Sequence, residues 1–205
     1  MDKFISHFDH ALRTCFSVHR STRACPELAE NSRNLDTKDK LLSSGLMRVN
    51  HAGEVAAQAL YQSQQLTARH SHLQQTLKQA GEEELDHLAW TKQRLDELGG
   101  RPSLLNPIWY GGAFALGLLA GKISDTANLS FLRATEEKVS QHLDSHLTLL
   151  PEHDLRSRSI VNAMRKEEAK HAESAKHAGG KPLVKPFSFV MDFYAKTMTT
   201  LAQKI

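Results

Sequence analysis

Two short stretches of the sequence place a glutamate three residues before a histidine. They are Glu84–His87 (ELDH) and Glu168–His171 (EAKH). Residues at positions i and i+3 lie on the same face of a helix, so each pair can direct a carboxylate oxygen and an imidazole nitrogen to one point. Because carboxylate and imidazole are common ligands of divalent metal ions, each stretch predicts half of a metal site.

A further glutamate precedes each pair at a matched distance. Glu54 precedes Glu84 by 30 residues, and Glu136 precedes Glu168 by 32. The sequence therefore repeats a helix pair, and two helix pairs predict a four-helix bundle with approximate twofold symmetry. The six candidate metal ligands are Glu54, Glu84, His87, Glu136, Glu168 and His171.

Four long helices are expected to carry these residues. Apolar residues recur at helical spacing over 38–69, 71–98, 122–150 and 154–178. Each forms a seam, meaning a row of apolar residues along one helix face, and in each seam a glutamate replaces a hydrophobic residue. A buried carboxylate costs several kcal/mol unless it is paired, protonated or bound to metal. No matching set of lysines or arginines faces these seams, so two divalent cations are expected to balance the four negative charges.

The ligand types indicate which metal binds. Carboxylate-rich sites with one imidazole per metal favour iron or manganese over zinc. Iron is the better choice, because a pair of ferrous ions can deliver two electrons and react with O2. The prediction is two iron ions per chain, with the four glutamates acting through the metal centre.

Several polar residues near the ligands have simpler interpretations. His51 precedes Glu54 by three residues and could be a metal ligand, but a residue that supports a ligand, or an exposed residue, is the preferred interpretation. Tyr61 is either ordinary core packing or a hydroxyl that lines the site. Four charged neighbours off the seams are predicted to be solvated: Glu82, Glu83, Glu137 and Glu167. Asp86 and Lys170 are predicted to point away from the site, and His142 and His146 to lie at the bundle edge.

The two ends of the chain are expected to add amphipathic helices. Residues 1–19 place Phe4, Phe8, Leu12 and Cys15 or Phe16 on one face, and a polar linker follows over Arg20–Thr37. Residues 183–205 form a last amphipathic stretch rich in aromatics. No alternating strand pattern is present, so the fold is predicted to be all-α, with 1–37 as an N-terminal helix and linker and 38–205 as the bundle.

Residues 102–121 differ from the rest because they carry no charge. Their length would suffice for a membrane span, but Pro107 and several glycines interrupt the apolar run. A re-entrant or interfacial segment, or a buried crossover between the two helix pairs, fits better.

Composition narrows the function. A net charge of +3, spread along the chain, is too small for a nucleic-acid-binding protein but suits an anionic membrane surface. The two cysteines form neither a disulfide framework nor a metal knuckle. A ferritin-like ferroxidase or iron-binding bundle shares the ligand set, but it is not expected to carry a twenty-residue uncharged segment. A helical membrane-binding protein without iron would not need six ligand-type residues.

Several motifs resemble the Coq7 family of demethoxyubiquinone hydroxylases, which are ferritin-like di-iron carboxylate proteins. They are Asn50–Glu54 (NHAGE), Glu84–His87, the block from Arg101-Pro102 to Trp109 with the glycine-rich stretch after it, Glu136-Glu137 and Glu168–His171. The resemblance runs from about Leu41 to the C-terminus. Carried over to this sequence, it places the iron ligands on the same six residues, with Glu84 and Glu168 bridging the metals, and helix phase favours Glu136 over Glu137.

The resemblance implies O2-dependent hydroxylation of a demethoxyubiquinol in ubiquinone biosynthesis. The substrate is a membrane-dissolved polyprenyl quinol, so 102–121 and the aromatic C-terminal helix are candidate membrane-docking surfaces. A bacterial member is expected to be a peripheral protein on the cytoplasmic side of the cell membrane. The electron source is a reductase, NADH or the quinol itself, and the sequence does not decide among them. Other proteins of ubiquinone biosynthesis are candidate partners, and the sequence is compatible with an oligomer.

Overall fold

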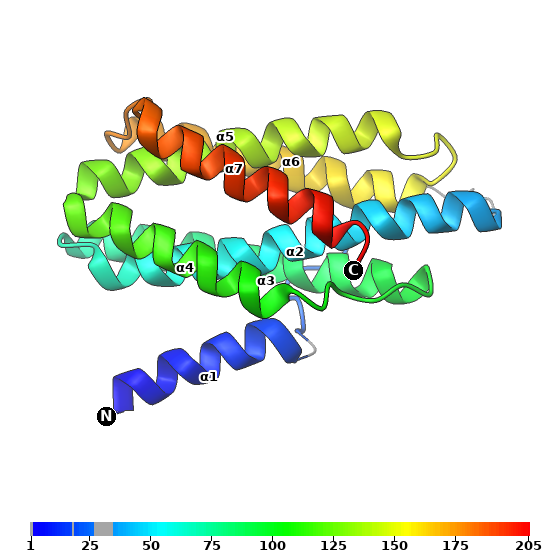
Figure 1. The fold of residues 1–205 in the computed structure, drawn as a ribbon, viewed down its shortest axis with the longest axis horizontal. Coiled ribbons are helices and arrows are strands. Elements are labelled where there is room, and N and C mark those ends of the chain that lie inside the picture. The colour runs from blue at the N-terminus through cyan, green and yellow to red at the C-terminus, as the bar shows by residue number, and fades with distance from the viewer. Residues whose placement is uncertain (1, 18, 27–34) are drawn as a thin grey trace.

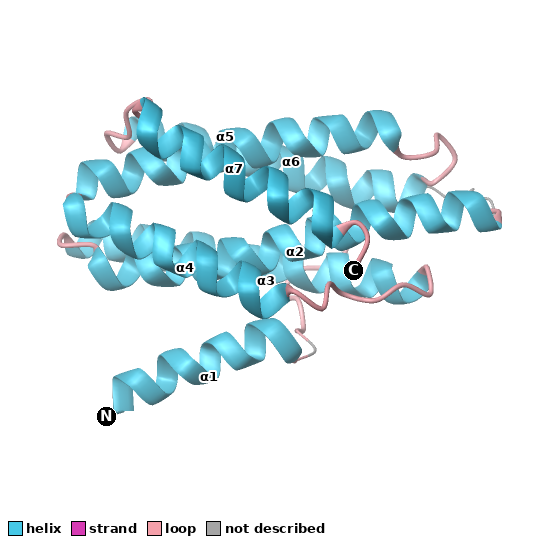
Figure 2. Ribbon diagram, viewed as in Figure 1, coloured by secondary structure: helices cyan, strands magenta, loops and turns pink. Residues whose placement is uncertain are grey.

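The structure is a computed structural model that describes residues 2–17, 19–26 and 35–205. Within these residues it contains helices and loops and no strands (Figure 2), which confirms the all-α prediction. The four long helices begin and end within about three residues of the predicted limits. The helices are α1 (Asp2–Phe16), α2 (Thr37–Thr67), α3 (Ser71–Glu97), α4 (Asn106–Ile123), α5 (Asp125–Leu149), α6 (Leu155–His177) and α7 (Lys185–Ala202).

Local side chains fix where the long helices start and stop. Asp36, Ser124 and Asp154 cap α2, α5 and α6, each accepting a backbone N–H of the first turn at 2.8–3.0 Å. Gly99 and Gly179 follow α3 and α6 with φ of 69° and 108°. Glycine adopts this left-handed conformation without steric cost, so the chain can leave each helix sharply.

Two helix pairs form the bundle, and α4 crosses between them. In Figure 1, α2 and α3 lie along one side and α5 and α6 along the other, and each pair packs along its length. The seams of all four helices turn inward: Met47 of α2, Leu77 of α3, Leu143 of α5 and Met164 of α6 are buried at 2% exposure or less. This is the predicted ferritin-like four-helix bundle, and it brings the interrupting glutamates into one interior.

The uncharged segment forms a continuous helix for most of its length. From Asn106 to Ile123 it is α4, which packs along α2 and contacts α5. Trp109 and Ala113 lie on its buried face, whereas Ile108 and Leu119 are about 60% exposed on the other face. One face of this helix is therefore buried, as a crossover between the two helix pairs predicts, and the other is exposed. No helix among the described residues combines the length and apolar character needed to cross a membrane.

The two terminal helices leave apolar side chains exposed. On α1, Phe8, Leu12 and Phe16 are exposed, and the helix instead packs on α2 and α4 through a side that includes Ala11 and Thr14. The side chain of Phe4 lies outside the described residues. On α7, which crosses the bundle in red in Figure 1, Phe189, Val190 and Phe193 are exposed while Met191 and Met198 are buried.

Close packing of α4 on α2 depends on Gly117. A Cβ atom there would lie 2.2 Å from Ser63 Oγ and 2.8 Å from Leu60 Cδ1, whereas one at Gly111 of the same helix would have no atom within 4 Å. We predict that Gly117→Ala lowers the free energy of unfolding by about 1–3 kcal/mol through overpacking. The matched control Gly111→Ala should raise it by about 0.5–1 kcal/mol, because alanine favours the helix. Urea unfolding measures both, and equal effects would contradict the close helix contact.

Candidate metal centre

The bundle interior collects four carboxylates and two imidazoles from its four helices. Each carboxylate residue is exposed by no more than 2%, His87 is fully buried, and the His171 side chain is 12% exposed. The residues are Glu54 from α2, Glu84 and His87 from α3, Glu136 from α5, and Glu168 and His171 from α6. All six predicted site residues therefore lie together, on helices whose spacing was read from the sequence.

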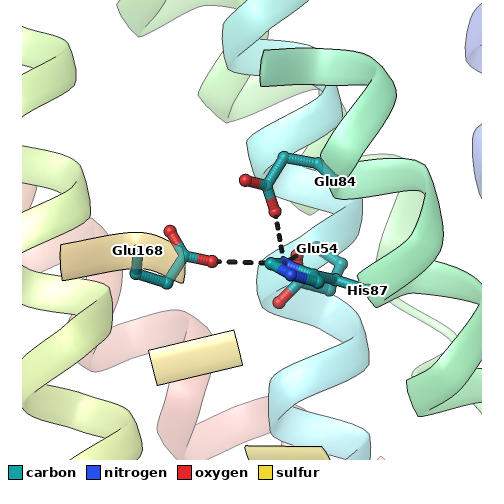
Figure 3. A group of neighbouring side chains, drawn as sticks. All are labelled: Glu54, Glu84, His87 and Glu168. Carbon is teal, nitrogen blue, oxygen red and sulfur yellow. Dashed lines mark hydrogen bonds and ion pairs between the residues drawn. The ribbon is translucent and has the colours of Figure 1, made fainter. Parts of the chain in front are cut away.

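These residues form two overlapping groups of possible ligands. One group contains Glu54, Glu84, His87 and Glu168, and in it one ligand atom from each residue lies within 4.8 Å of the others. The second group is Glu84, Glu136, Glu168 and His171 under the same limit. Figure 3 shows the first group, in which the carboxylates of Glu84 and Glu168 approach the ring of His87 from different helices. His87 Nδ1 lies 2.8 Å from Glu84 Oε2 and 3.4 Å from Glu168 Oε1.

Burial and mutual repulsion raise the pKa values of three of the four carboxyl groups in this interior. Burial raises the pKa of Glu54 and of Glu136 well above the usual range, and neighbouring carboxylates raise both further. The same causes, with the charge of Glu84 as the main repulsion, raise the pKa of Glu168 to about 7. Near neutral pH these groups therefore hold protons unless another cation takes their place.

The pKa values of the two imidazoles are also raised, and the imidazoles keep Glu84 ionised. Burial lowers the pKa of His87 and of His171, but contacts with Glu84 and other carboxylates outweigh it, so that His87 rises well above its usual pKa and His171 rises to about 9. Burial also opposes the charge on Glu84, and the two imidazoles overcome this and lower its pKa. The interior thus contains carboxylates whose charge is balanced by protons and imidazolium groups, an arrangement that divalent cations can replace.

Tyr61 lines this interior. It is 2% exposed, and its hydroxyl donates to Glu136 Oε1 at 2.8 Å. Burial, followed by the charge of Glu136, raises the pKa of the phenol well above 10, so that it stays a neutral donor. Of the two interpretations of Tyr61, the hydroxyl that lines the site agrees with this hydrogen bond.

Helix phase separates Glu136 from its neighbour. The Glu137 side chain is 45% exposed and pairs with Arg133 at 2.7 Å. Glu82 on α3 is 63% exposed and also faces solvent. Both are the solvated charges that the sequence predicts.

Glu167 is only 21% exposed and is not the solvated charge that the sequence predicts, whereas Glu83 is 40% exposed but also contacts a candidate ligand. Glu167 Oε2 lies 2.8 Å from His87 Nε2, and Glu83 Oε2 lies 3.0 Å from His171 Nε2. Each carboxylate thus binds the histidine of the opposite helix and leaves that histidine's Nδ1 toward the interior. Metal-ligating histidines commonly donate their other ring N–H to a carboxylate. The repeated Glu-Glu pair before each histidine, at 83–84 and 167–168, is the sequence signal for this arrangement.

The N-terminal segment also contributes, which the sequence does not predict. Asp86 points away from the ligand groups as expected, but it is only 2% exposed, and Thr22 N donates to its Oδ1 at 2.6 Å. Arg23 Nε donates to its Oδ2 at 2.5 Å. Thr22 and Arg23, assigned to a polar linker, therefore contact α3, while 27–34 of that linker lie outside the described residues. Lys170 is exposed as predicted.

The remaining histidines belong to neither ligand group. His51 is buried at 4% exposure, and burial lowers its pKa to about 3, so an exposed position is wrong for it. His146 is also buried, at 3%, with its ring 4.0 Å from that of His142. Burial lowers the pKa of His146 to about 3 as well, and the predicted edge position is wrong for this residue.

An apolar cavity lies beside the candidate centre, between α2, α4, α5 and α7. Its walls include Gly53, Ala56, Leu60, Ala113, Leu116, Phe131, Met191 and Met198. A second cavity shares Gly53, Val139 and Met198 with it and reaches Asn50 and Glu54. The apolar cavity thus adjoins a second, more polar cavity, which reaches the candidate ligand Glu54 and includes Lys138, His142 and Lys196 in its wall.

Comparison with known proteins agrees with this geometry. Residues 42–202 match the family model described as ubiquinone biosynthesis protein COQ7. A curated protein of Polynucleobacter asymbioticus named 3-demethoxyubiquinol 3-hydroxylase is 50% identical over 100% of this chain and 99% of its own length. Proteins of the same name from Polaromonas sp. and Chromobacterium violaceum are 50% and 49% identical, over 98% and 100% of this chain and 97% and 100% of their own. The chain therefore belongs to the Coq7 family of ubiquinone biosynthesis proteins.

Proposed function

We propose that this chain is a 3-demethoxyubiquinol 3-hydroxylase, a monooxygenase that uses O2 to add a hydroxyl group to the ring of a demethoxyubiquinol. The observation that carries the proposal is the pair of ligand groups that share Glu84 and Glu168, in a chain half identical to enzymes of that name over its full length. A ferroxidase or other iron-binding bundle is not favoured, because the relatives match from end to end and an apolar cavity adjoins a second cavity that reaches Glu54.

The proposed cofactor is two iron ions. Glu54 and His87 would serve one ion, Glu136 and His171 the other, and Glu84 and Glu168 both. Each ion would thus have three carboxylates and one imidazole: Glu54, Glu84, His87 and Glu168 for the first ion, and Glu84, Glu136, Glu168 and His171 for the second. Oxygen-rich donors with one nitrogen fit iron, and four carboxylates balance two divalent ions. When bound, the iron pair supplies the redox chemistry by which O2 hydroxylates the ring.

The chain's own residues position and isolate the substrate. The apolar walls around Ala113 and Leu116 suit the prenyl tail, and the polar end at Asn50 and Glu54 suits the quinol ring. Because the interior excludes water, oxidant is directed to the ring and not lost to solvent. Tyr61 holds Glu136 in place through its hydrogen bond.

We propose that the exposed apolar side chains of α1, α4 and α7 dock the chain on a membrane, from which the quinol enters. They are Phe8, Leu12 and Phe16 of α1, Ile108 and Leu119 of α4, and Phe189, Val190 and Phe193 of α7. Exposed apolar groups of this extent mark interaction surfaces, and α4 and α7 also line the apolar cavity. The proposed location is the cytoplasmic face of the cell membrane, with a reductase, NADH or the quinol as electron donor.

The first prediction from the proposed function concerns Glu168→Gln in the metal-free chain. At pH 8 wild-type Glu168 is an ionised, buried acid, so the neutral variant should have a free energy of unfolding higher by about 1–3 kcal/mol. The gain should shrink as the pH falls through 7 toward 5, because wild-type Glu168, with its raised pKa, then becomes neutral as well. Iron binding should fall from two ions to at most one.

Urea unfolding from pH 5 to pH 8, with iron analysis of reconstituted protein, tests this prediction. The exposed Glu137→Gln should change stability by less than about 0.5 kcal/mol and leave iron binding intact. Two tightly bound irons in Glu168→Gln would contradict the ligand assignment.

A second prediction compares the activities of Glu136→Ala and Glu137→Ala. Loss of a metal ligand should reduce hydroxylation to below about 1% of wild type. The change at Glu137 should preserve most activity, since that side chain pairs with Arg133 at the surface. The assay is conversion of a short-tailed demethoxyubiquinol by the iron-loaded chain, followed by mass spectrometry. The reverse result would refute the helix phase of the site.

A third prediction tests the membrane surface with Ile108→Glu and Leu119→Glu. Each substitution places a carboxylate on the exposed face of α4. The variant that carries both should bind anionic liposomes at least about tenfold more weakly than the wild type. Leu149→Glu, at the exposed end of α5, is the matched control and should bind normally. Leu116 is unsuitable for this purpose because it lines the cavity. Co-sedimentation measures binding, and unchanged sedimentation of the α4 variant would rule out this docking face.

A further inference from the structure

Arg23, from the segment that precedes the bundle, contacts two helices of the candidate centre. Its Nε donates to Asp86 Oδ2 of α3 at 2.5 Å. Its two terminal nitrogens donate to the two carboxylate oxygens of Glu167 on α6, each at 2.9 Å. The guanidinium also lies 4.9 Å above the ring of Trp90. A planar guanidinium held by three charged hydrogen bonds and an aromatic ring fixes the positions of its partners more firmly than a single ion pair does.

Arg23 is connected to His87 through a shared oxygen. Glu167 Oε2 accepts from Arg23 and also lies 2.8 Å from His87 Nε2. With Nε2–H donating to Glu167, Nδ1 faces Glu84 and Glu168, and the ring can turn its Nδ1 lone pair to a metal ion that replaces the Nδ1 proton. A histidine needs this tautomer and orientation to bind a metal through Nδ1.

The other half of the site lacks a contact between Arg23 and a carboxylate, because Arg23 Nη2 reaches only the backbone carbonyl oxygen of Glu83, at 3.5 Å. His171 Nε2 lies 3.0 Å from Glu83 Oε2, but the Glu83 side chain is 40% exposed. Among the described residues, His171 is the only cationic partner of that carboxylate. Glu167, by comparison, is 21% exposed and held at both oxygens. The repeat that relates the two helix pairs is therefore broken outside the six ligands, by a residue from the N-terminal segment.

We propose that Arg23 is a positioning residue for the His87 half of the metal centre, acting through Glu167, and that this half consequently binds its metal ion more tightly than the His171 half. The inference rests on the proposed metal site and adds an order of filling to it. A simpler alternative is that Arg23 only attaches the N-terminal segment to the bundle. In that case its loss would lower stability or free the segment but leave metal affinity unchanged.

Cobalt(II) titration of the full-length, metal-free chain separates these alternatives, because calorimetry gives the affinity of each step and visible absorption reports coordination. The wild type should bind two ions in two resolved steps. Glu167→Gln should weaken the tighter step by about 10- to 100-fold, and Glu83→Gln should weaken the other by a similar factor. Arg23→Gln should weaken the same step as Glu167→Gln and change the same absorption band.

A double-mutant cycle tests whether Arg23 acts through Glu167. The Arg23→Gln/Glu167→Gln chain should bind cobalt as Glu167→Gln alone does, because the pathway is already broken. Arg23→Lys should be intermediate, since one ammonium cannot replace the two-pronged contact. Arg13→Gln removes an exposed arginine paired with Asp9 on α1 and should leave both steps unchanged.

Unchanged cobalt affinities in Arg23→Gln, or additive losses in the double variant, would overturn the positioning role while leaving the metal centre intact. Two wild-type steps of equal affinity would overturn the order of filling. A wild-type chain that binds no metal would overturn the proposed function as well, so the two failures are distinguishable. Circular dichroism of each variant, measured beside the titration, verifies that the helices remain formed.

Discussion

Four carboxylates within one dry helical core repel one another, and an uncompensated buried charge of this kind costs several kcal/mol. In the metal-free chain that cost is met by raised acid pKa values and by two imidazoles that gain protons beside Glu84. The same arrangement favours divalent cations, because two of them neutralise the carboxylates without protons. The bundle must therefore be stable enough in its apolar layers to tolerate this strained centre. Buried Met47, Leu77, Leu143 and Met164 along the seams supply that support.

The internal repeat gives the centre its approximate twofold symmetry, but the surroundings of the two halves differ. Each histidine is held at Nε2 by a glutamate from the opposite helix, which locks α3 to α6 across the centre. Arg23 reinforces one of these contacts and leaves the other at the surface. Two metal positions with different supports can differ in affinity and reactivity even when their ligands are the same.

Two helices outside the four-helix bundle, α4 and α7, line the apolar cavity that we propose receives the substrate. α4 packs closely on α2 through Gly117, and α7 is tied to α4 where the Tyr194 hydroxyl donates to the Trp109 carbonyl at 2.5 Å. Between these elements lies the apolar cavity, and their outer faces carry exposed aromatic and aliphatic side chains. Under the proposed function, these two helices place an exposed apolar surface beside the cavities, the second of which reaches the candidate ligand Glu54.

The sequence by itself determined the four long helices, the bundle and the grouping of the six candidate ligands, but it did not show that 106–123 forms a helix. Helical periodicity is local, so a glutamate within an apolar seam is assigned to the interior before any packing is known, as Glu136 and Glu137 illustrate. Only the tertiary structure decided which residues support the ligands. Glu83 and Glu167 lie off their own seams and reach a histidine on another helix, and Arg23 meets Glu167 across 144 residues of chain. Such contacts depend on the rotation and spacing of packed helices and on where an irregular segment docks, and no periodic pattern within one segment encodes them.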